Sequence, residues 1–267
     1  MTDAGPWDHG MSAALAARME RVANEVALDW GLRLGPRMPE GRYSYVAPAG
    51  DDAILKVVPP EDDDADHIAE ALRLWDGSGA VRLRRHDPVR RALLERVRPG
   101  IEAAALPEED ARRVAIEVGR RIWCAAPEGH PFRPITRWVE RWMPPDDRHP
   151  LVRIARRTYE RMEPRADVLV HTDFHHHNLL QRGVEWVVID PKPFLGEPEF
   201  DVISFLANPI GLLPSLALIE RRIAAFEDAG LDGDRIRHWS IVRGILDGLP
   251  EAGEPEPARM QIARMLL

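Results

Sequence analysis

The sequence predicts an α+β fold with a β-rich amino-terminal part and a mainly helical carboxy-terminal part. Short apolar runs bounded by turn residues lie within residues 43–97, as expected of strands. From residue 107 onward, apolar residues recur mostly at helical spacing. Within 167–201, two short apolar runs each end in polar residues that can carry chemistry. These three observations divide the chain into a sheet, a helical region and a polar centre.

Composition limits the class of protein. The chain has 267 residues, of which 45% are apolar and 30% charged, as in soluble globular proteins. The net charge of −8 argues against a nucleic-acid partner and suits a cationic one. No apolar run is long enough for a signal peptide or a membrane span, so we expect a cytoplasmic protein without a membrane partner. A single cysteine, Cys124, excludes an internal disulfide. A monomer is the default expectation.

The amino-terminal part is predicted to contain a helix, then strands around a second helix. Leu15, Met19 and Val22 recur at helical spacing over residues 11–30, and Gly31 ends that helix. The predicted strands are residues 43–46, 53–58, 80–83 and 92–97. The acidic run 61–66 precedes the second helix, because negative charge is favourable at a helix start.

The carboxy-terminal part is predicted to be helical except near its centre. The predicted helices are residues 107–126, 135–143, 151–161, 201–206, 212–229 and 234–249, and a Pro- and Glu-rich linker at 250–257 leads to a short terminal helix. Residues 168–170 and 186–189 are predicted strands. The turn 181–185, with Gly183, is expected to bring the second strand beside the first.

The loops after these two strands hold the residues that point to a chemistry. His171, Asp173 and Asn178 form the pattern His-x-Asp-x-x-x-x-Asn, and Asp190 follows the second strand. This is the catalytic-loop pattern of protein-kinase-like folds. A carboxylate there orients and deprotonates an attacking hydroxyl, while an Asn and a second Asp hold Mg²⁺ on nucleotide phosphates. The pattern therefore predicts phosphoryl transfer from a nucleotide.

Lys56 lies in the middle of an apolar predicted strand, where an unpaired ammonium is costly to bury. We expect it to hold the α- and β-phosphates and to be steadied by a carboxylate of the following helix. Glu70 and Asp66 are both candidates, since residues four apart share a helix face. Glu70 is the preferred partner.

In a two-lobed kinase, the strand after this helix runs into a hinge whose backbone reads the adenine edge. That position corresponds to Glu95 to Val97, just before Pro99-Gly100. We therefore expect a nucleotide-binding lobe at residues 1–97 and a catalytic and substrate-binding lobe at 98–267. The turn-rich stretch 35–46 stands where a loop covers the phosphates, although it lacks the repeated glycines.

The sequence resembles the aminoglycoside phosphotransferase family, in its streptomycin 6-kinase and hydroxyurea phosphotransferase branch. The resemblance is carried by HTDFHHHN at 171–178, IDPKPFLGEPEFD at 189–201, ALRLWDGSGAV at 71–81 and LLERVRPG at 93–100. It implies a two-lobed protein-kinase-like fold with the nucleotide in the cleft. Asp173 matches the catalytic base and Lys56 the phosphate-binding lysine. Asn178 and Asp190 match the magnesium ligands.

The resemblance also assigns supporting roles and exposes departures. Asp201 matches the carboxylate that braces the catalytic loop, and His171 supports the same loop. Thr172 and His177 stand where the family usually has glycine, so a positive φ at either would be strained. The proline after Asp190 argues against a swinging regulatory segment, because its φ is fixed.

The function predicted is an ATP- and Mg²⁺-dependent phosphotransferase acting on a hydroxyl of a small, cationic molecule, an aminoglycoside such as streptomycin. Hydroxyurea or another small metabolite is the alternative acceptor. Two other classes stay open: a catalytically silent nucleotide-binding relative, and a metal-dependent hydrolase built on the histidines of 171–177. Phosphoryl transfer requires both Lys56 and Asn178, and a hydrolase needs neither.

Carboxylates close to Asp201 and beyond it are candidates for binding a cationic acceptor, because the resemblance places the helices after Asp201 on the substrate side. Glu197 and Glu199 are the first choices, with Asp228, Asp232 and Asp247 further along.

Overall fold

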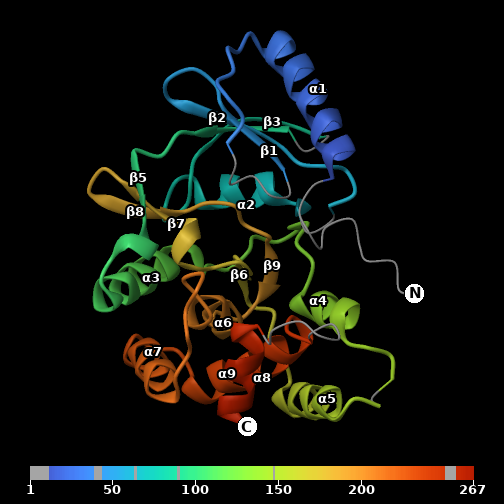
Figure 1. Ribbon diagram of the computed structural model, residues 1–267, viewed down its shortest axis with the longest axis vertical. Coiled ribbons are helices and arrows are strands. Elements are labelled where there is room, and N and C mark those ends of the chain that lie inside the picture. Colours follow the sequence, from blue (N-terminus) through green and yellow to red (C-terminus); the bar gives the residue numbers. More distant parts are fainter. Residues whose placement is uncertain (1–11, 39–43, 63–64, 89–90, 147, 250–256) are drawn as a thin grey trace.

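The structure is a computed structural model that describes residues 12–38, 44–62, 65–88, 91–146, 148–249 and 257–267. A sheet and two helices form its amino-terminal part, and helices surround small sheets in the remainder (Figure 1). The predicted α+β arrangement is therefore confirmed. The stretches 39–43, 63–64 and 250–256 lie outside the described residues. They hold part of the predicted phosphate-covering loop, of the acidic run and of the predicted linker.

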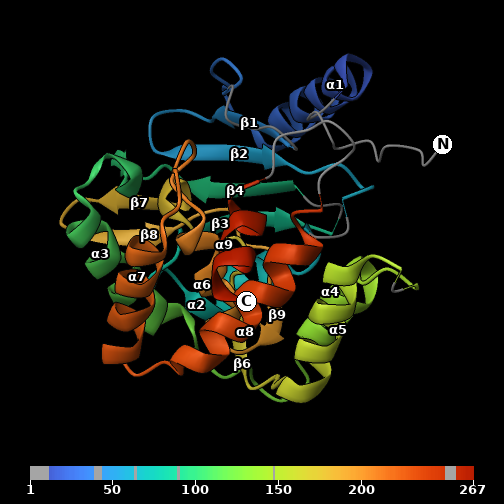
Figure 2. The ribbon, with the colours of Figure 1, turned by 60° about the horizontal axis from the view of Figure 1, so that its bottom comes forward.

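The amino-terminal sheet is antiparallel, with the order β1 (Tyr45–Pro48), β2 (Ala53–Val57), β4 (Arg91–Glu95) and β3 (Leu83–Asp87). Side chains alternate between its faces. Leu55 and Val57 belong to the apolar cluster with α1 (Ala13–Trp30), whereas Leu94 belongs to the cluster with α2 (Ile68–Trp75). Figure 2 shows the strands stacked beneath α1. Because Lys56 alternates with Leu55, it faces away from α1 and toward the rest of the molecule.

Two smaller sheets lie below this one. β5 (Pro99–Glu102), β7 (Leu179–Arg182) and β8 (Glu185–Val188) form one, and β6 (Val168–Val170) pairs with β9 (Phe194–Gly196) in the other. The expectation that residues 186–189 return beside 168–170 is wrong. The short 3-10 helix η3 (His176–Asn178) leads directly into β7, and β7 supplies the partner for β8. β6 pairs instead with the segment after Asp190.

The helices of the carboxy-terminal part are α3 (Glu108–Ile122), α4 (Ile135–Trp142), α5 (Pro150–Met162), α6 (Glu199–Leu206), α7 (Leu216–Asp228), α8 (Gly233–Leu246) and α9 (Ala258–Leu266). Of these, α5, α6, α7 and α9 pack against α8, whereas α3 packs against α7 and α4 against β9. Trp239 of α8 is fully buried and contacts Phe200 edge to face. Among the described helices, none has the length and apolar character that crossing a membrane requires.

Candidate active site

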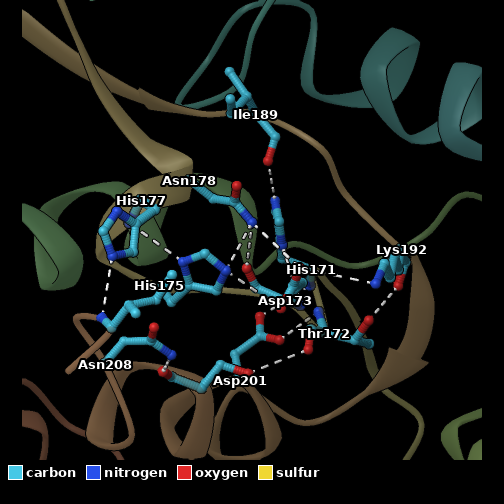
Figure 3. A network of polar contacts seen from close by, with 12 residues as sticks. His171, Thr172, Asp173, His175, His177, Asn178, Ile189, Lys192, Asp201 and Asn208 are labelled. Atoms are coloured by element: carbon cyan, nitrogen blue, oxygen red, sulfur yellow. Dashed lines mark hydrogen bonds and ion pairs between the residues drawn. The ribbon is translucent and has the colours of Figure 1, made fainter. Parts of the chain in front are cut away.

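The loops after β6 and β8 lie side by side, and His171 of the first contacts Ile189 of the second (Figure 3). Lys56 of β2 contacts the second loop through Asp190. The first carries His171 to Asn178 and the second carries Asp190. Two backbone links hold them together: the amide of Ile189 donates to the carbonyl of Asn178 at 2.9 Å, and the amide of Lys192 donates to the carbonyl of His171 at 3.0 Å. Residues far apart in sequence therefore form one polar network.

Asp201, at the start of α6, braces the first loop. It is fully buried and accepts hydrogen bonds from the amides of His171 at 2.9 Å and Thr172 at 2.6 Å, and from the indole of Trp123 at 2.9 Å. Burial is the largest influence on this carboxyl and raises its pKa to about 6, against the effect of these donors. This geometry fits the bracing role that the resemblance implied.

His171 is also fully buried, and its ring links the two loops. Its Nε2 lies 2.9 Å from the carbonyl of Ile189, and its Nδ1 accepts from the amide of Asp173 at 3.3 Å. These partners require a neutral ring protonated on Nε2. Burial lowers the pKa of His171 to about 4, so this neutral form persists at physiological pH.

Of the two positions where glycine was expected, only Thr172 has a positive φ, 59°. Its hydroxyl donates to the carbonyl of Lys192 at 2.6 Å. His177 lies in η3 and does not share this conformation. Instead its Nδ1 lies 2.6 Å from Glu102, and its Nε2 accepts from the amide of Ile210 at 3.2 Å.

The carboxylate of Asp173 points into the space between the loops and is 22% exposed. Asn178 donates to its backbone carbonyl at 2.9 Å and approaches Oδ2 at 3.4 Å. Burial acts to raise the pKa of Asp173, but contact with His175 and the charges of Lys192 and Arg259 outweigh it and hold the pKa well below its usual range. The carboxylate is therefore ionised at neutral pH, as a group that orients a hydroxyl must be.

Asp190 and Asn178 provide oxygen donors of the kind that Mg²⁺ prefers. The amide nitrogen of Asn178 is bonded to Asp173, which directs its oxygen elsewhere. Asp190 has a φ of 57° and forms an ion pair with Lys56. Desolvation acts to raise the pKa of Asp190, but Lys56 and Lys192 hold it below its usual value. The residues present thus fit a magnesium nucleotide.

The predicted pairing of Lys56 with Glu70 is wrong for this structure, because Lys56 pairs with Asp190. Glu70 lies 3.7 Å from Arg73, one turn along its own helix, and Asp66 lies 3.7 Å from Arg133. A cavity of about 290 Å³ separates α2 from the sheet, and both Lys56 and Glu70 line it.

The predicted hinge follows β4. The amide of Arg96 donates to the carbonyl of Asp52 at 2.8 Å, and the Glu95 side chain lies 3.1 Å from Arg182. Within the described ranges, no protein group accepts a hydrogen bond from the amide of Val97. The role of Glu95 and Val97 toward adenine stays a prediction.

Glu197 and Glu199, which were expected to receive the substrate, are buried in this structure and bound to groups of the protein itself. Glu197 is 2% exposed and forms a two-pronged ion pair with Arg235, whose Nη2 lies 2.6 Å away. Glu199 is 6% exposed and accepts from the amide of Asp232 at 3.0 Å. Both carboxylates link the start of α6, or the residues just before it, to the start of α8.

Sequence reasoning missed three cations near Asp173. Lys192 and Arg259 each lie 3.9 Å from its carboxylate, and buried Arg243 bonds to the carbonyl of Thr172. Lys192 could have been found from its place two residues after Asp190. Arg243 and Arg259 lie on distant helices, and nothing in the sequence near Asp173 indicates them.

The histidines do not gather around one point. His171 and His177 bond to different loops, and His176 is buried against Phe205 with a ring separation of 4.0 Å. Across the described ranges there is no group of three or more His, Cys, Asp or Glu side chains placed to hold a metal ion.

Comparison with known proteins gives one family. Residues 35–252 match the family described as aminoglycoside/hydroxyurea antibiotic resistance kinase. The chain is 32% identical over 263 residues to a hydroxyurea phosphotransferase of Kitasatospora aureofaciens, covering 89% of this chain and 76% of the relative. It is 28% identical to a streptomycin 6-kinase of Streptomyces glaucescens, covering 95% of this chain and 90% of that one.

Solved structures give the fold. A choline kinase from Streptococcus pneumoniae superposes with a TM-score of 0.66 at 14% identity, covering 93% of this chain and 99% of that one. An aminoglycoside-3'-phosphotransferase of type VIII gives a TM-score of 0.55 at 18% identity, covering 84% and 98%. At such identities these likenesses concern the fold alone, and they confirm the protein-kinase-like architecture.

Proposed function

Because the chain belongs to the aminoglycoside/hydroxyurea antibiotic resistance kinase family, we propose that it transfers the γ-phosphate of ATP, with Mg²⁺, to a hydroxyl of a small molecule. It is a phosphotransferase acting on a hydroxyl group. One observation supports the finer proposal most: Asp173, Asn178, Asp190 and Lys56 meet in one network from three separate segments. The nucleotide is expected between residues 1–97 and 98–267, in a cytoplasmic monomer.

In the proposed reaction, Asp173 holds the acceptor hydroxyl in line with the γ-phosphorus. The hydroxyl oxygen forms the new bond to phosphorus, and the bond from phosphorus to the β,γ-bridging oxygen breaks. ADP leaves with that oxygen, and the hydroxyl proton passes to Asp173. Such transfer depends mainly on positioning and on neutralising charge.

Lys56, Asn178 and Asp190 serve the nucleotide. Asn178 and Asp190 would hold Mg²⁺, which neutralises phosphate charge when bound. Lys56 exchanges its contact with Asp190 for the phosphates, and Glu95 and Val97 offer backbone groups to adenine. His171 and Asp201 keep the loop in place through the bonds described above.

The names of the relatives give two acceptor classes. Streptomycin, a cationic aminoglycoside, is the acceptor that the sequence favoured, and hydroxyurea is the alternative. The carboxylates that supported a cationic acceptor are partly engaged inside the protein, so both acceptors belong in the first experiment.

We predict that Asp173→Asn lowers kcat by about 100-fold or more, the usual contribution of a positioned general base. Its amide has nearly the same shape as the carboxylate, so the melting temperature and the stabilisation by Mg²⁺ and ATP should change little. ATP consumption with each acceptor measures the first effect, and thermal unfolding measures the second.

Asp29→Asn, at an exposed position of α1, is the matched control and should keep wild-type activity. A variant at Asp173 that keeps more than a few per cent of kcat rules out its role as base. Binding of ATP without turnover by the wild type identifies a silent relative, and absence of ATP binding refutes the proposed nucleotide site.

A further inference from the structure

Arg259, on the last helix, reaches the carboxylate proposed as the base. Its Nη2 lies 3.9 Å from Asp173 Oδ1, and the same atom lies 3.4 Å from the hydroxyl of Ser204. Its Nη1 forms an ion pair with Asp247, which also binds Arg243 at 3.1 Å. These contacts hold the guanidinium in place while leaving its side chain 25% exposed.

The 3.9 Å gap is too long for a hydrogen bond. A guanidinium has five N–H donors, and Asp173 satisfies none of those on Arg259 directly. An oxygen atom of a bound molecule placed beside both groups can accept from Arg259 while its neighbouring hydroxyl meets Asp173. The Arg259 guanidinium is therefore placed to donate to a ligand oxygen that lies beside Asp173.

Lys192 and Arg259 approach Asp173 from different sides. Lys192 faces Oδ2 at 3.9 Å and also acts on Asp190, so it lies toward the proposed phosphate site. Arg259 faces Oδ1, and the main charges acting on Asp190 are Lys56, Lys192 and Asp173. Arg259 thus faces the carboxylate oxygen of Asp173 that Lys192 does not, so an acceptor hydroxyl bound at Oδ1 would lie beside its guanidinium.

The described carboxylates near this side are engaged by the protein itself. Glu197 pairs with Arg235, Glu199 binds the Asp232 amide, and Asp247 is shared by Arg243 and Arg259. A cationic acceptor held at Asp173 would meet Arg259 at close range, and like charges so placed repel. The charge distribution favours an acceptor without positive charge.

We propose that Arg259 is a specificity-determining residue that binds an oxygen of the acceptor. The acceptor class it selects is a small, uncharged compound with a carbonyl oxygen close to the reacting hydroxyl, rather than a polycationic aminoglycoside. This proposal rests on the proposed phosphotransferase function and deepens it. The reacting bonds are those given above; Arg259 gains or loses no proton.

The test compares hydroxyurea and streptomycin as acceptors for the wild type, Arg259→Gln and Arg264→Gln, at saturating ATP and Mg²⁺. Arg264 is exposed on the same helix, so its variant matches the change in net charge. We expect hydroxyurea to be the better acceptor of the wild type. Arg259→Gln should raise the KM for hydroxyurea by about 10- to 100-fold, as expected for a lost hydrogen bond to a charged group. The KM for ATP should stay unchanged. Arg264→Gln should leave both constants unchanged.

The other outcomes overturn either the role of Arg259 or the proposed phosphotransferase function. Preference for streptomycin, or equal constants for the two variants, overturns the role of Arg259 while the phosphotransferase stands. Stabilisation by ATP and Mg²⁺ without turnover of either acceptor overturns the role of Arg259 and points to the silent relative described above. Because Arg259→Gln can loosen α9, thermal unfolding is measured beside kinetics: a KM effect accompanied by an equal loss of ATP affinity marks a structural role and refutes the proposal. Absence of ATP binding by the wild type refutes the proposed function itself.

Discussion

Two residues of the candidate site have backbone conformations that L-amino acids rarely adopt. Thr172 and Asp190 have φ values of 59° and 57°. A β-branched residue in this region costs about 1–2 kcal/mol relative to glycine. At Thr172 the hydroxyl compensates in part through its hydrogen bond to the carbonyl of Lys192. The site therefore retains side-chain chemistry at a position that sterics alone would give to glycine.

We predict that Thr172→Gly is more stable than Thr172→Ala by about 1 kcal/mol. Both variants lose the hydroxyl, but only glycine removes the steric cost of the positive φ. Urea unfolding of the two purified variants measures the difference. If the alanine variant is as stable as the glycine variant or more stable, the positive φ at Thr172 carries no steric cost, and the threonine contributes only its hydrogen bond.

At this scale the sequence predicted the residues of local motifs and missed those that distant segments supply. Asp173 and Asn178 lie five apart in one loop, and Asp201 follows a recognisable stretch, so spacing was enough. Arg259 reaches the same carboxylate from the last helix, and its position depends on how α9 packs. The sequence also does not reveal which carboxylates are buried. Glu197 was predicted to face the substrate, but it pairs with Arg235 inside the protein.

At the scale of elements, His177 joins three segments. Its ring connects η3 to Glu102 at the end of β5, and to the amide of Ile210 in the loop between α6 and α7. A glycine at this position would lack all of these contacts. The histidine therefore adds a cross-link beside the catalytic loop where the family usually has a residue without a side chain.

A double-mutant cycle tests this link. We predict a coupling of about 0.5–1 kcal/mol in unfolding free energy between His177→Ala and Glu102→Ala, modest because both groups are partly exposed. A second cycle pairs His177→Ala with Glu185→Ala, whose partner is Arg182, and should give a coupling near zero. Equal couplings in the two cycles would contradict the link.

The order of helices and strands could be predicted from periodicity, but the pairing of the central strands could not. The strands at 168–170 and 186–189 look like neighbours because a turn with Gly183 lies between them. The run 179–182 precedes that turn and takes the second strand as its own partner, forming β7 and β8. Local apolar patterns do not reveal which of several short runs pair, since that choice depends on the packing of the whole lobe.

On the scale of the whole molecule, buried charged and polar groups connect the helices. Arg222 of α7 is fully buried and donates to the carbonyls of Phe205, Leu206 and Asn208 at 2.7–2.9 Å, and to Glu108 of α3. His176, like Trp239 and Ser240, is a buried side chain that does not follow this pattern. It is 2% exposed, and in the described part of the chain neither ring nitrogen has a hydrogen-bond partner. The ring stacks on Phe205.

His176 should make the protein sensitive to acid. Burial, aided by the charge of Arg222, lowers its pKa from 6.5 to about 3. Below pH 6.5 the unfolded chain therefore binds a proton that the folded protein does not, so stability falls as the pH falls toward 3. The variant His176→Phe keeps the stacking and cannot titrate. We predict that its unfolding free energy, relative to that of the wild type, is about 1 kcal/mol higher at pH 5.5 than at pH 7.5. Urea unfolding at both pH values measures this difference, and the contributions of titratable groups that the two proteins share cancel in the comparison.

The control variant is His238→Gln, which removes a histidine from the exposed face of α8. If the difference in unfolding free energy between variant and wild type is the same at both pH values, His176 takes up its proton in the folded state, and the loop opens to water around it.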